Sequence, residues 1–354
     1  MHWIQSTDKE ADMKKEHILD VRDLAVDFDT DQGTVYADRD ITLEVNEGEI
    51  VGLVGESGSG KSVSMYSVMG LLAENGHITS GEIFLDGKNI TPGAFSSMKE
   101  YDKVMDDIRG KDMAMIFQDP MTFLNPTLTI GRQIEEVILN HSSCSKEEAE
   151  KKAIDLLRQV GIPSPETRLK QYPHQFSGGM RQRIIIAIAL ANEPRLLICD
   201  EPTTALDVTI QAQVLDLIKK LSREKGSSVI LITHDLGVVA GMCDYIYIMY
   251  GGKIVESGTD QDIFYRPSHP YTKGLLNCIT NPDEEEYKEL RPIPGSPPDL
   301  LKPPVGCPFV DRCEKAMRIC KKQMPVFTQF TEDHKSACWL NEVNRRKQEG
   351  GCHE

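Results

Sequence analysis

The sequence lacks any hydrophobic run long enough to cross a membrane. Its most apolar segments, RIIIAIALA at residues 183–191 and SVILIT at residues 228–233, are far shorter than the roughly 20 residues of a spanning helix. The first 17 residues mix both charge signs and have no apolar core, so they do not read as a signal peptide. We therefore expect a cytosolic chain in which residues 1–17 form a flexible tail.

An excess of basic charge is also missing. The formal net charge is −15, from 55 acidic and 40 basic side chains. A broad nucleic-acid surface needs clustered lysine and arginine to displace counterions from the phosphates. The sequence likewise has no internal repeat and no heptad run. We therefore expect no nucleic-acid partner and no coiled coil.

Buried strands alternate with helices from residue 18 to about residue 264. Continuous apolar segments, typical of strands covered on both faces, occupy residues 49–55, 113–118, 195–202 and 228–235. Helical patterns lie between them, and one ends at Gly226, a normal helix stop. This alternation predicts an α/β domain with a mainly parallel sheet, joined near its start by an antiparallel flap.

A glycine-rich phosphate-binding motif follows the first of these strands. GESGSGKS fits the pattern G-x-x-x-x-G-K-[ST] and lies between a strand and a helix, which is the context that a P-loop requires. The pattern predicts backbone N–H groups around phosphate oxygens, Lys61 at the β- and γ-phosphates, and the Ser62 hydroxyl on Mg²⁺. The motif consists of Gly55, Glu56, Ser57, Gly58, Ser59, Gly60, Lys61 and Ser62.

An acidic pair ends another apolar strand. Asp200 and Glu201 follow four apolar residues, at the strand end where α/β sheets place their ligands. Asp200 suits a Mg²⁺ shell, and Glu201 suits the polarisation of an attacking water. Alone, such a pair is more often a helix cap, but the P-loop favours the catalytic interpretation.

A second candidate anion site begins the most apolar helix. In FSGGMRQR, Ser177 can cap the helix, while Gly178 and Gly179 leave its first amides accessible. The alternative is an ordinary capped helix with a buried face.

Together these motifs resemble the ATP-binding subunits of ABC transporters. The resemblance implies an ABC-type P-loop ATPase domain at residues 18–265, with a mixed or parallel core sheet and a helical subdomain at about residues 119–182. It further implies ATP and Mg²⁺ as ligands. Gln118 matches the glutamine that senses Mg²⁺ and contacts the permease, Asp207 matches the D-loop, and His234 matches the switch histidine.

An aromatic side chain before the P-loop stacks on adenine in that family. Both Phe28 and Tyr36 precede the P-loop, and the sequence does not distinguish between them.

The chain after residue 266 resembles the C-terminal part of peptide-importer ATPases. SHPYTKGLL, PIPGSPP and GCPFVDRC match the tail of the oligopeptide and dipeptide permease ATPases, closest to the subunit called D. The resemblance implies an energy-coupling ATPase bound peripherally at the cytoplasmic face of the membrane. Its partners would be a homologous second ATPase, two permease subunits and, indirectly, an extracellular or periplasmic substrate-binding protein. A nickel-importer ATPase and a soluble ABC ATPase outside transport are the alternatives.

Four cysteines lie in this extension, residues 266–354. Because stable disulfides are unusual in the cytosol, a zinc site, an iron–sulfur cluster and reduced structural thiols stay open. The spacing matches neither a common zinc pattern nor a ferredoxin. The resemblance implies a [4Fe–4S] cluster, so we expect one, with Zn²⁺ as the alternative, on Cys307, Cys313, Cys320 and Cys338.

Overall fold

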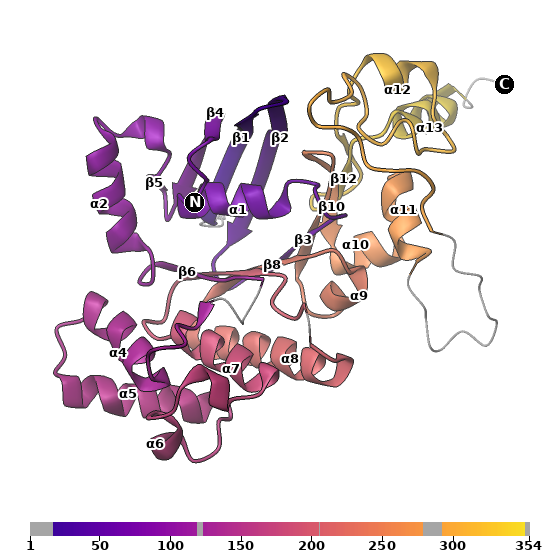
Figure 1. The fold of residues 1–354 in the computed structure, drawn as a ribbon. Coiled ribbons are helices and arrows are strands. Elements are labelled where there is room, and N and C mark those ends of the chain that lie inside the picture. The colour runs from indigo at the N-terminus through magenta and orange to yellow at the C-terminus, as the bar shows by residue number, and fades with distance from the viewer. Residues whose placement is uncertain (1–16, 119–122, 205, 279–291, 351–354) are drawn as a thin grey trace, which may run out of the picture.

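A computed structural model describes residues 17–118, 123–204, 206–278 and 292–350. Two sheets and the helices packed on them form the part of the chain predicted to be an ATPase domain (the ATPase part), and the C-terminal extension lies against one end of it (Figure 1). The predicted N-terminal tail lies outside the described residues, except for His17. Among the described residues, no helix combines the length and the apolar character that a membrane crossing requires.

The larger sheet has eight strands in the order β11-β12-β10-β9-β3-β8-β7-β6. Strands β6, β7, β8, β3 and β9 pair in parallel, while β10, β12 and β11 pair antiparallel, which confirms a mixed core sheet. Every residue of β3, β6, β7 and β8 is buried, as the apolar runs predict. The strands are β3 (Ile50–Val54), β6 (Met113–Ile116), β7 (Leu196–Asp200), β8 (Ser228–Thr233), β9 (Tyr245–Tyr250), β10 (Lys253–Thr259), β11 (Thr328–Gln329) and β12 (Lys335–Ser336).

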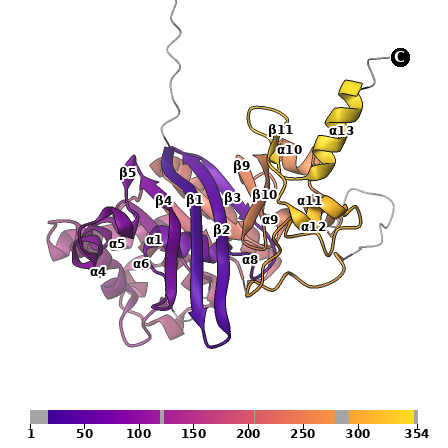
Figure 2. The same cartoon turned by 90° about the horizontal axis from the view of Figure 1, so that it is seen from above.

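A smaller antiparallel sheet forms the predicted flap, in the order β2-β1-β4-β5. In Figure 2 its long strands lie side by side over the core sheet. Its strands are β1 (His17–Thr30), β2 (Gly33–Asn46), β4 (Gly76–Leu85) and β5 (Lys88–Asn89).

The core sheet separates two apolar clusters. Alternate residues of β3 face opposite ways: Val51 and Leu53 join the cluster under the flap, while Ile50 and Val54 join the cluster on the other face. Buried residues of α1 and α2 complete the first cluster, and those of α7, α8, α9 and α10 complete the second. These helices are α1 (Lys61–Met69), α2 (Met98–Ile108), α7 (Gly178–Ala189), α8 (Val208–Lys225), α9 (Leu236–Val239) and α10 (Asp260–Tyr265).

Three more helices pack beside α7, at the end of the molecule opposite the extension (Figure 1). They are α4 (Ile130–His141), α5 (Lys146–Gln159) and α6 (Pro165–Arg168). Ser145 and Glu148 form a reciprocal capping box at the start of α5, which fixes where this helix begins. The helical subdomain at about residues 119–182 stays a prediction, and its first residues, 119–122, lie outside the described part of the chain.

The extension joins the core sheet through strand β12. Ser336 and Lys335 pair antiparallel with Glu256 and Ser257 of β10, so the extension continues the sheet of the ATPase part. Residues 292–317 contain no regular helix or strand, in line with their proline content. The extension's helices are α11 (Pro270–Leu276), α12 (Arg318–Lys322) and α13 (Trp339–Gly350).

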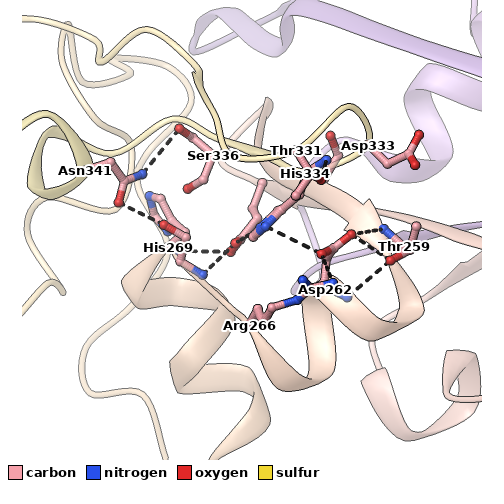
Figure 3. A network of polar contacts seen from close by, with 12 residues as sticks. Thr259, Asp262, Arg266, His269, Thr331, Asp333, His334, Ser336 and Asn341 are labelled. Atoms are coloured by element: carbon pink, nitrogen blue, oxygen red, sulfur yellow. Dashed lines mark hydrogen bonds and ion pairs between the residues drawn. The ribbon is translucent and has the colours of Figure 1, made fainter. Parts of the chain in front are cut away.

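A buried polar network holds this junction together (Figure 3). The carboxylate of Glu256, which is fully buried, accepts the backbone N–H groups of Ser268 and His269 at 2.6 and 2.9 Å. The Nε2 atom of His334, in the loop before β12, lies 2.9 Å from the same carboxylate. Because a buried carboxylate is costly without partners, these contacts fix the extension at one position on the sheet.

Candidate functional site

The P-loop connects β3 to α1 and requires glycine at two left-handed positions. Gly58 and Gly60 have φ values of 75° and 104°. A Cβ atom at Gly60 would lie 2.2 Å from Oδ1 of Asp38, so a side chain there would clash as well as strain the backbone. These positions explain why the sequence between a strand and a helix contains so much glycine.

Lys61 is buried against the loop that it follows. Its Nζ atom donates to the carbonyl oxygens of Gly55 and Glu56 at 2.7 and 2.9 Å and lies 3.4 Å from Oγ of Ser59. Burial lowers the pKa of the ammonium, while the carboxylates of Glu201 and Asp200 act in the opposite direction. The contacts keep this cation beside the backbone amides of the P-loop.

Ser62 and Asp200 form an oxygen-rich pair. The Oγ atom of Ser62 donates to Oδ1 of Asp200 at 2.9 Å, across the gap between α1 and the end of β7. Burial raises the pKa of the Asp200 carboxyl, although its hydrogen bonds with Ser62 and Tyr66 act against this. Burial and the nearby Asp200 raise the pKa of Tyr66 to about 12, so this phenol stays protonated. Hydroxyl and carboxylate oxygens are the ligands that Mg²⁺ prefers, and the pair therefore fits that ion.

The carboxylate of Glu201 lies at the centre of the candidate catalytic group. Its Oε2 atom accepts the side-chain amide of Gln118 at 2.9 Å and the hydroxyl of Thr204 at 3.0 Å, and its Oε1 atom lies 2.9 Å from Nδ1 of His234. Burial raises the pKa of Glu201, but its hydrogen bonds with His234 and Thr204 outweigh burial, and the pKa is lowered overall. The side chain is therefore an ionised carboxylate near neutral pH.

Strand ends explain why residues so far apart in sequence meet. Gln118 follows β6, Glu201 follows β7, His234 follows β8 and the P-loop follows β3. Since these strands are parallel neighbours, their carboxyl ends share one edge of the sheet. Glu201 also has a φ of 45°, a left-handed conformation that is uncommon outside glycine and typical of functional positions. The sequence does not point to Thr204 or Tyr66, which have no motif of their own.

The residues of the SGGM segment lie apart from this group. Ser177 caps α7 by accepting the N–H of Met180 at 3.4 Å, and Asp207 caps α8 by accepting the N–H of Ile210 at 3.1 Å. Both caps line one open groove of about 640 Å³, with no P-loop residue in its lining. The groove is lined by Gly161, Ser177, Gly178, Gly179, Met180, Arg183, Leu206, Asp207, Ile210 and Gln213.

The two candidate aromatic residues differ in their surroundings. Phe28 packs against the apolar cluster under the flap, and its ring covers Gly76, where a Cβ atom would lie 2.6 Å from the ring. Tyr36 is 40% exposed on β2. Tyr36 is therefore the more exposed of the two candidates.

The prediction of an iron–sulfur cluster is wrong. Across the described residues, no three or more His, Cys, Asp or Glu side chains are arranged to hold a metal ion. The four extension cysteines are free thiols that line one cavity of about 10 Å³, roughly the space of a single water molecule. Burial raises the pKa of Cys307 to about 12 and that of Cys338 to about 11, so these thiols are protonated near neutral pH.

Two of these thiols belong to an apolar core, and Cys313 packs against it. Cys307 and Cys320 are buried in the same cluster as Phe309, Val310 and Tyr271, which is continuous with the main core of the ATPase part. The sequence indicates a proline-flanked tail with little material for a core of its own. The tail instead shares the core of the neighbouring domain, where cysteine packs as a small apolar residue.

Comparison with known proteins agrees with this geometry. The model of the ABC transporter family matches residues 39–204, and that of the oligopeptide/dipeptide transporter C-terminal region matches residues 255–320. Among solved structures, the dimeric post-hydrolysis state of the ATP-binding cassette MJ0796 bound to ADP and phosphate is 28% identical, with a TM-score of 0.58. That match covers 68% of this chain and 98% of the cassette.

Curated relatives match over almost the whole chain. The dipeptide transport ATP-binding protein DppD of Bacillus subtilis is 52% identical, with 92% of this chain and 96% of that protein covered. The oligopeptide transport ATP-binding protein OppD of Escherichia coli is 46% identical, with 93% and 95% covered. The chain belongs to the ATP-binding proteins of the ABC transporter family that carry the oligopeptide/dipeptide transporter C-terminal region. It is an ATP-hydrolysing enzyme of that class.

Proposed function

We propose that this chain hydrolyses ATP to drive the import of oligopeptides or dipeptides through a membrane permease. The observation that carries the proposal is the meeting of Gln118, Glu201 and His234 beside the P-loop, in a chain that also has the peptide-transporter extension. The chain would bind at the cytoplasmic face of two permease subunits, with an extracellular or periplasmic protein delivering the peptide. The relatives named for peptide transport support the cargo class.

ATP binds at the P-loop in this proposal. The amides of residues 55–62 surround the phosphates, Lys61 neutralises the β- and γ-phosphates, and the first turn of α1 adds its partial positive charge. The ring of Tyr36 stacks on adenine, because Tyr36 is more exposed than Phe28, which is partly buried against the apolar cluster under the flap. The Ser62–Asp200 pair would hold Mg²⁺, with the side-chain oxygen of Gln118 as a further ligand. The ion would neutralise phosphate charge when bound.

Glu201 acts as the general base. It takes a proton from the attacking water while the γ-phosphoryl group passes from ADP to that water, giving ADP and phosphate. Gln118, Thr204 and His234 hold the carboxylate in one orientation, because three of their polar atoms lie within 3.0 Å of its oxygens. In this scheme His234 also contacts the γ-phosphate, since its ring is exposed at the same edge of the sheet.

Two ATPase chains form the complete site. Ser177, Gly178, Gly179 and Asp207 line a groove that includes no part of this chain's own P-loop, so they would complete the site of a partner. The partner is a homologous ATPase subunit in this proposal, as the resemblance to two-ATPase peptide importers implies.

Reconstitution tests the proposal. We would place this chain, its partner ATPase and the two permeases encoded with them in proteoliposomes, with the binding protein outside and Mg-ATP inside. The proposal expects uptake of a labelled peptide and ATP turnover stimulated by the loaded binding protein. Turnover stimulated by Ni²⁺ but not by peptides would contradict the peptide cargo, and turnover without any dependence on the permeases would contradict the transport role.

A further inference from the structure

An arginine of the extension reaches into the P-loop. The Nη1 atom of Arg312 donates to Oε2 of Glu56 at 2.6 Å, although the two residues are 256 positions apart in the sequence. Glu56 is the second residue of the P-loop motif, and the arginine side chain is only 7% exposed. The contact therefore connects the extension directly to the segment that surrounds the phosphates.

The guanidinium is held in place from several sides. Its Nη1 atom also donates to the hydroxyl of Tyr250 at 3.0 Å, its Nε atom to the carbonyl of Pro294 at 2.9 Å, and its Nη2 atom to the carbonyl of Ile293 at 3.1 Å. Burial opposes the charge, but the bonds with Glu56 and Tyr250 outweigh burial and raise the pKa of Arg312. Because all three nitrogens of the planar fork donate hydrogen bonds, the guanidinium is held in one orientation relative to the P-loop.

Glu56 is fixed through its backbone as well. Its N–H donates to the hydroxyl of Tyr271 at 2.9 Å, and its carbonyl oxygen accepts Nζ of Lys61 at 2.9 Å. Tyr271 is fully buried in α11 and packs against Tyr250 and Phe309, with ring centroids 4.5 and 5.3 Å apart. Three separate contacts thus determine where this P-loop residue lies, and two of them come from residues after 266.

Residues 292–317, the irregular segment before α12 that we call the connector, also contact β2 near the candidate adenine site. The carbonyl oxygen of Leu300 accepts the backbone N–H of Tyr36 at 3.0 Å, and that of Pro304 accepts Nη1 of Arg39 at 3.1 Å. The connector therefore supports both the phosphate side and the adenine side of the proposed nucleotide site.

The negative charge of Glu56 connects its contact with Arg312 to the binding of ATP. The phosphates of ATP are strongly anionic, and a P-loop carboxylate without a cation would repel them in a partly desolvated site. The ion pair with Arg312 offsets this charge. Other members of the P-loop motif carry no acidic side chain, so the need for a cation arises at Glu56.

We propose that Arg312 is a positioning residue of the ATP site. Its side chain neutralises the carboxylate of Glu56 and fixes its position, so the C-terminal extension contributes to ATP binding at the P-loop. This inference rests on the proposed binding of ATP at residues 55–62. It predicts that the extension controls the affinity for ATP and has little effect on the chemical step, because Arg312 does not contact Glu201 or its partners.

The test compares four variants of the full chain, each in its assembled complex. For each variant we would measure the KM and kcat of Mg-ATP hydrolysis, the Kd of Mg-ATP and the temperature of thermal unfolding. Arg312→Gln leaves the Glu56 carboxylate without its cation, and we expect a rise of about tenfold in KM and Kd with kcat changed less than twofold. The rise should shrink at high salt, because salt screens repulsion. Adding Glu56→Gln to Arg312→Gln should return KM to within about threefold of the unmodified protein.

A merely structural role predicts a different pattern. If Arg312 only anchors the extension, the double variant is at least as defective as Arg312→Gln, and this result would overturn the inference. The matched control is Lys321→Gln, which removes an exposed lysine of the same extension whose partner is Asp311, and it should leave KM unchanged.

A further variant keeps the inference testable if Arg312→Gln does not fold. If Arg312→Gln unfolds the extension, Glu56→Gln alone carries the test, because it keeps the side-chain shape and leaves Arg312 as an uncompensated cation. We then expect a KM equal to or below that of the unmodified protein, and a tenfold rise in KM would refute the inference. Loss of ATP binding in the unmodified protein would instead refute the proposed function, so the two failures are distinguishable.

Discussion

His269 makes the junction between the ATPase part and the extension sensitive to acid. Its ring is 1% exposed, and its Nδ1 atom accepts the backbone N–H of Tyr271, which caps α11. Burial lowers the pKa of this imidazole to about 4, although the carboxylate of Glu256 acts in the opposite direction. Protonation would place a charge in the core and remove the lone pair that caps the helix.

The expected magnitude follows from proton linkage. An unfolded histidine has a pKa of 6.5, so the folded and unfolded values differ by about 2.5 and correspond to about 3 kcal/mol of stability. Because the folded pKa is the lower one, the unfolded chain binds the proton more readily. The contribution is therefore complete above about pH 6.5, falls as the pH drops, and is lost at about pH 4.

His269→Asn isolates this effect. Asparagine is a good N-cap residue and can accept the same N–H without titrating. Urea unfolding is followed by circular dichroism between pH 7 and pH 4 for both proteins. We expect the unmodified chain to lose about 3 kcal/mol more than the variant over this range. Equal losses in the two proteins would refute the reasoning, because the remaining acid sensitivity would then come from other groups.

Three further predictions concern the nucleotide site. Lys61→Ala deletes a charged phosphate contact worth about 1.5–3 kcal/mol, so the Kd of Mg-ATP in equilibrium binding should rise by about tenfold to a hundredfold. Tyr36→Ala removes a stacking platform worth about 1–3 kcal/mol and should weaken ATP binding by about tenfold, whereas an unchanged Kd would rule out Tyr36 as the adenine partner. Ser177→Arg should block turnover in the assembled complex and leave the Kd of the isolated chain unchanged, and a loss of that binding would contradict the two-chain site.

Local sequence patterns predict the core sheet and the P-loop well. The strands β3, β6, β7 and β8 are continuous apolar runs, and such runs need no long-range information to be recognised. The turn at residues 55–62 is likewise determined locally, since the left-handed conformations of Gly58 and Gly60 limit which residues fit. The antiparallel flap follows from the same kind of pattern.

Contacts between distant segments are predicted only through the family resemblance. Gln118 and Glu201 are 83 positions apart, and Glu201 and His234 are 33 apart, so spacing alone says nothing about their meeting. Their place after neighbouring parallel strands brings them together, and the strand order is a property of the whole fold. Thr204 has no motif and becomes visible only in the structure, through its hydrogen bond to Glu201.

The cysteines of the extension show where local sequence patterns mislead. Their surroundings in the sequence are polar and rich in proline, which favours an interpretation as metal ligands. Packing against Phe309, Val310 and Tyr271 gives them an apolar environment that the spacing of cysteines does not reveal. The pairing of Arg312 with Glu56 is likewise not predictable from local pattern, because the two residues are 256 positions apart in the sequence.

The central claim is that Glu201 is the base for ATP hydrolysis in a site formed by strand ends. The most direct measurement is ATP turnover by the Glu201→Gln variant in the assembled complex, together with the ATP that it retains. Glu193→Gln is the matched control, since Glu193 is also a glutamate with positive φ, at 54°, but lies in an exposed pair with Lys225. We predict a fall in turnover of about 10²–10⁴-fold with ATP still bound for Glu201→Gln, and no change for Glu193→Gln. Turnover of the Glu201→Gln variant at the rate of the unmodified complex would contradict the account.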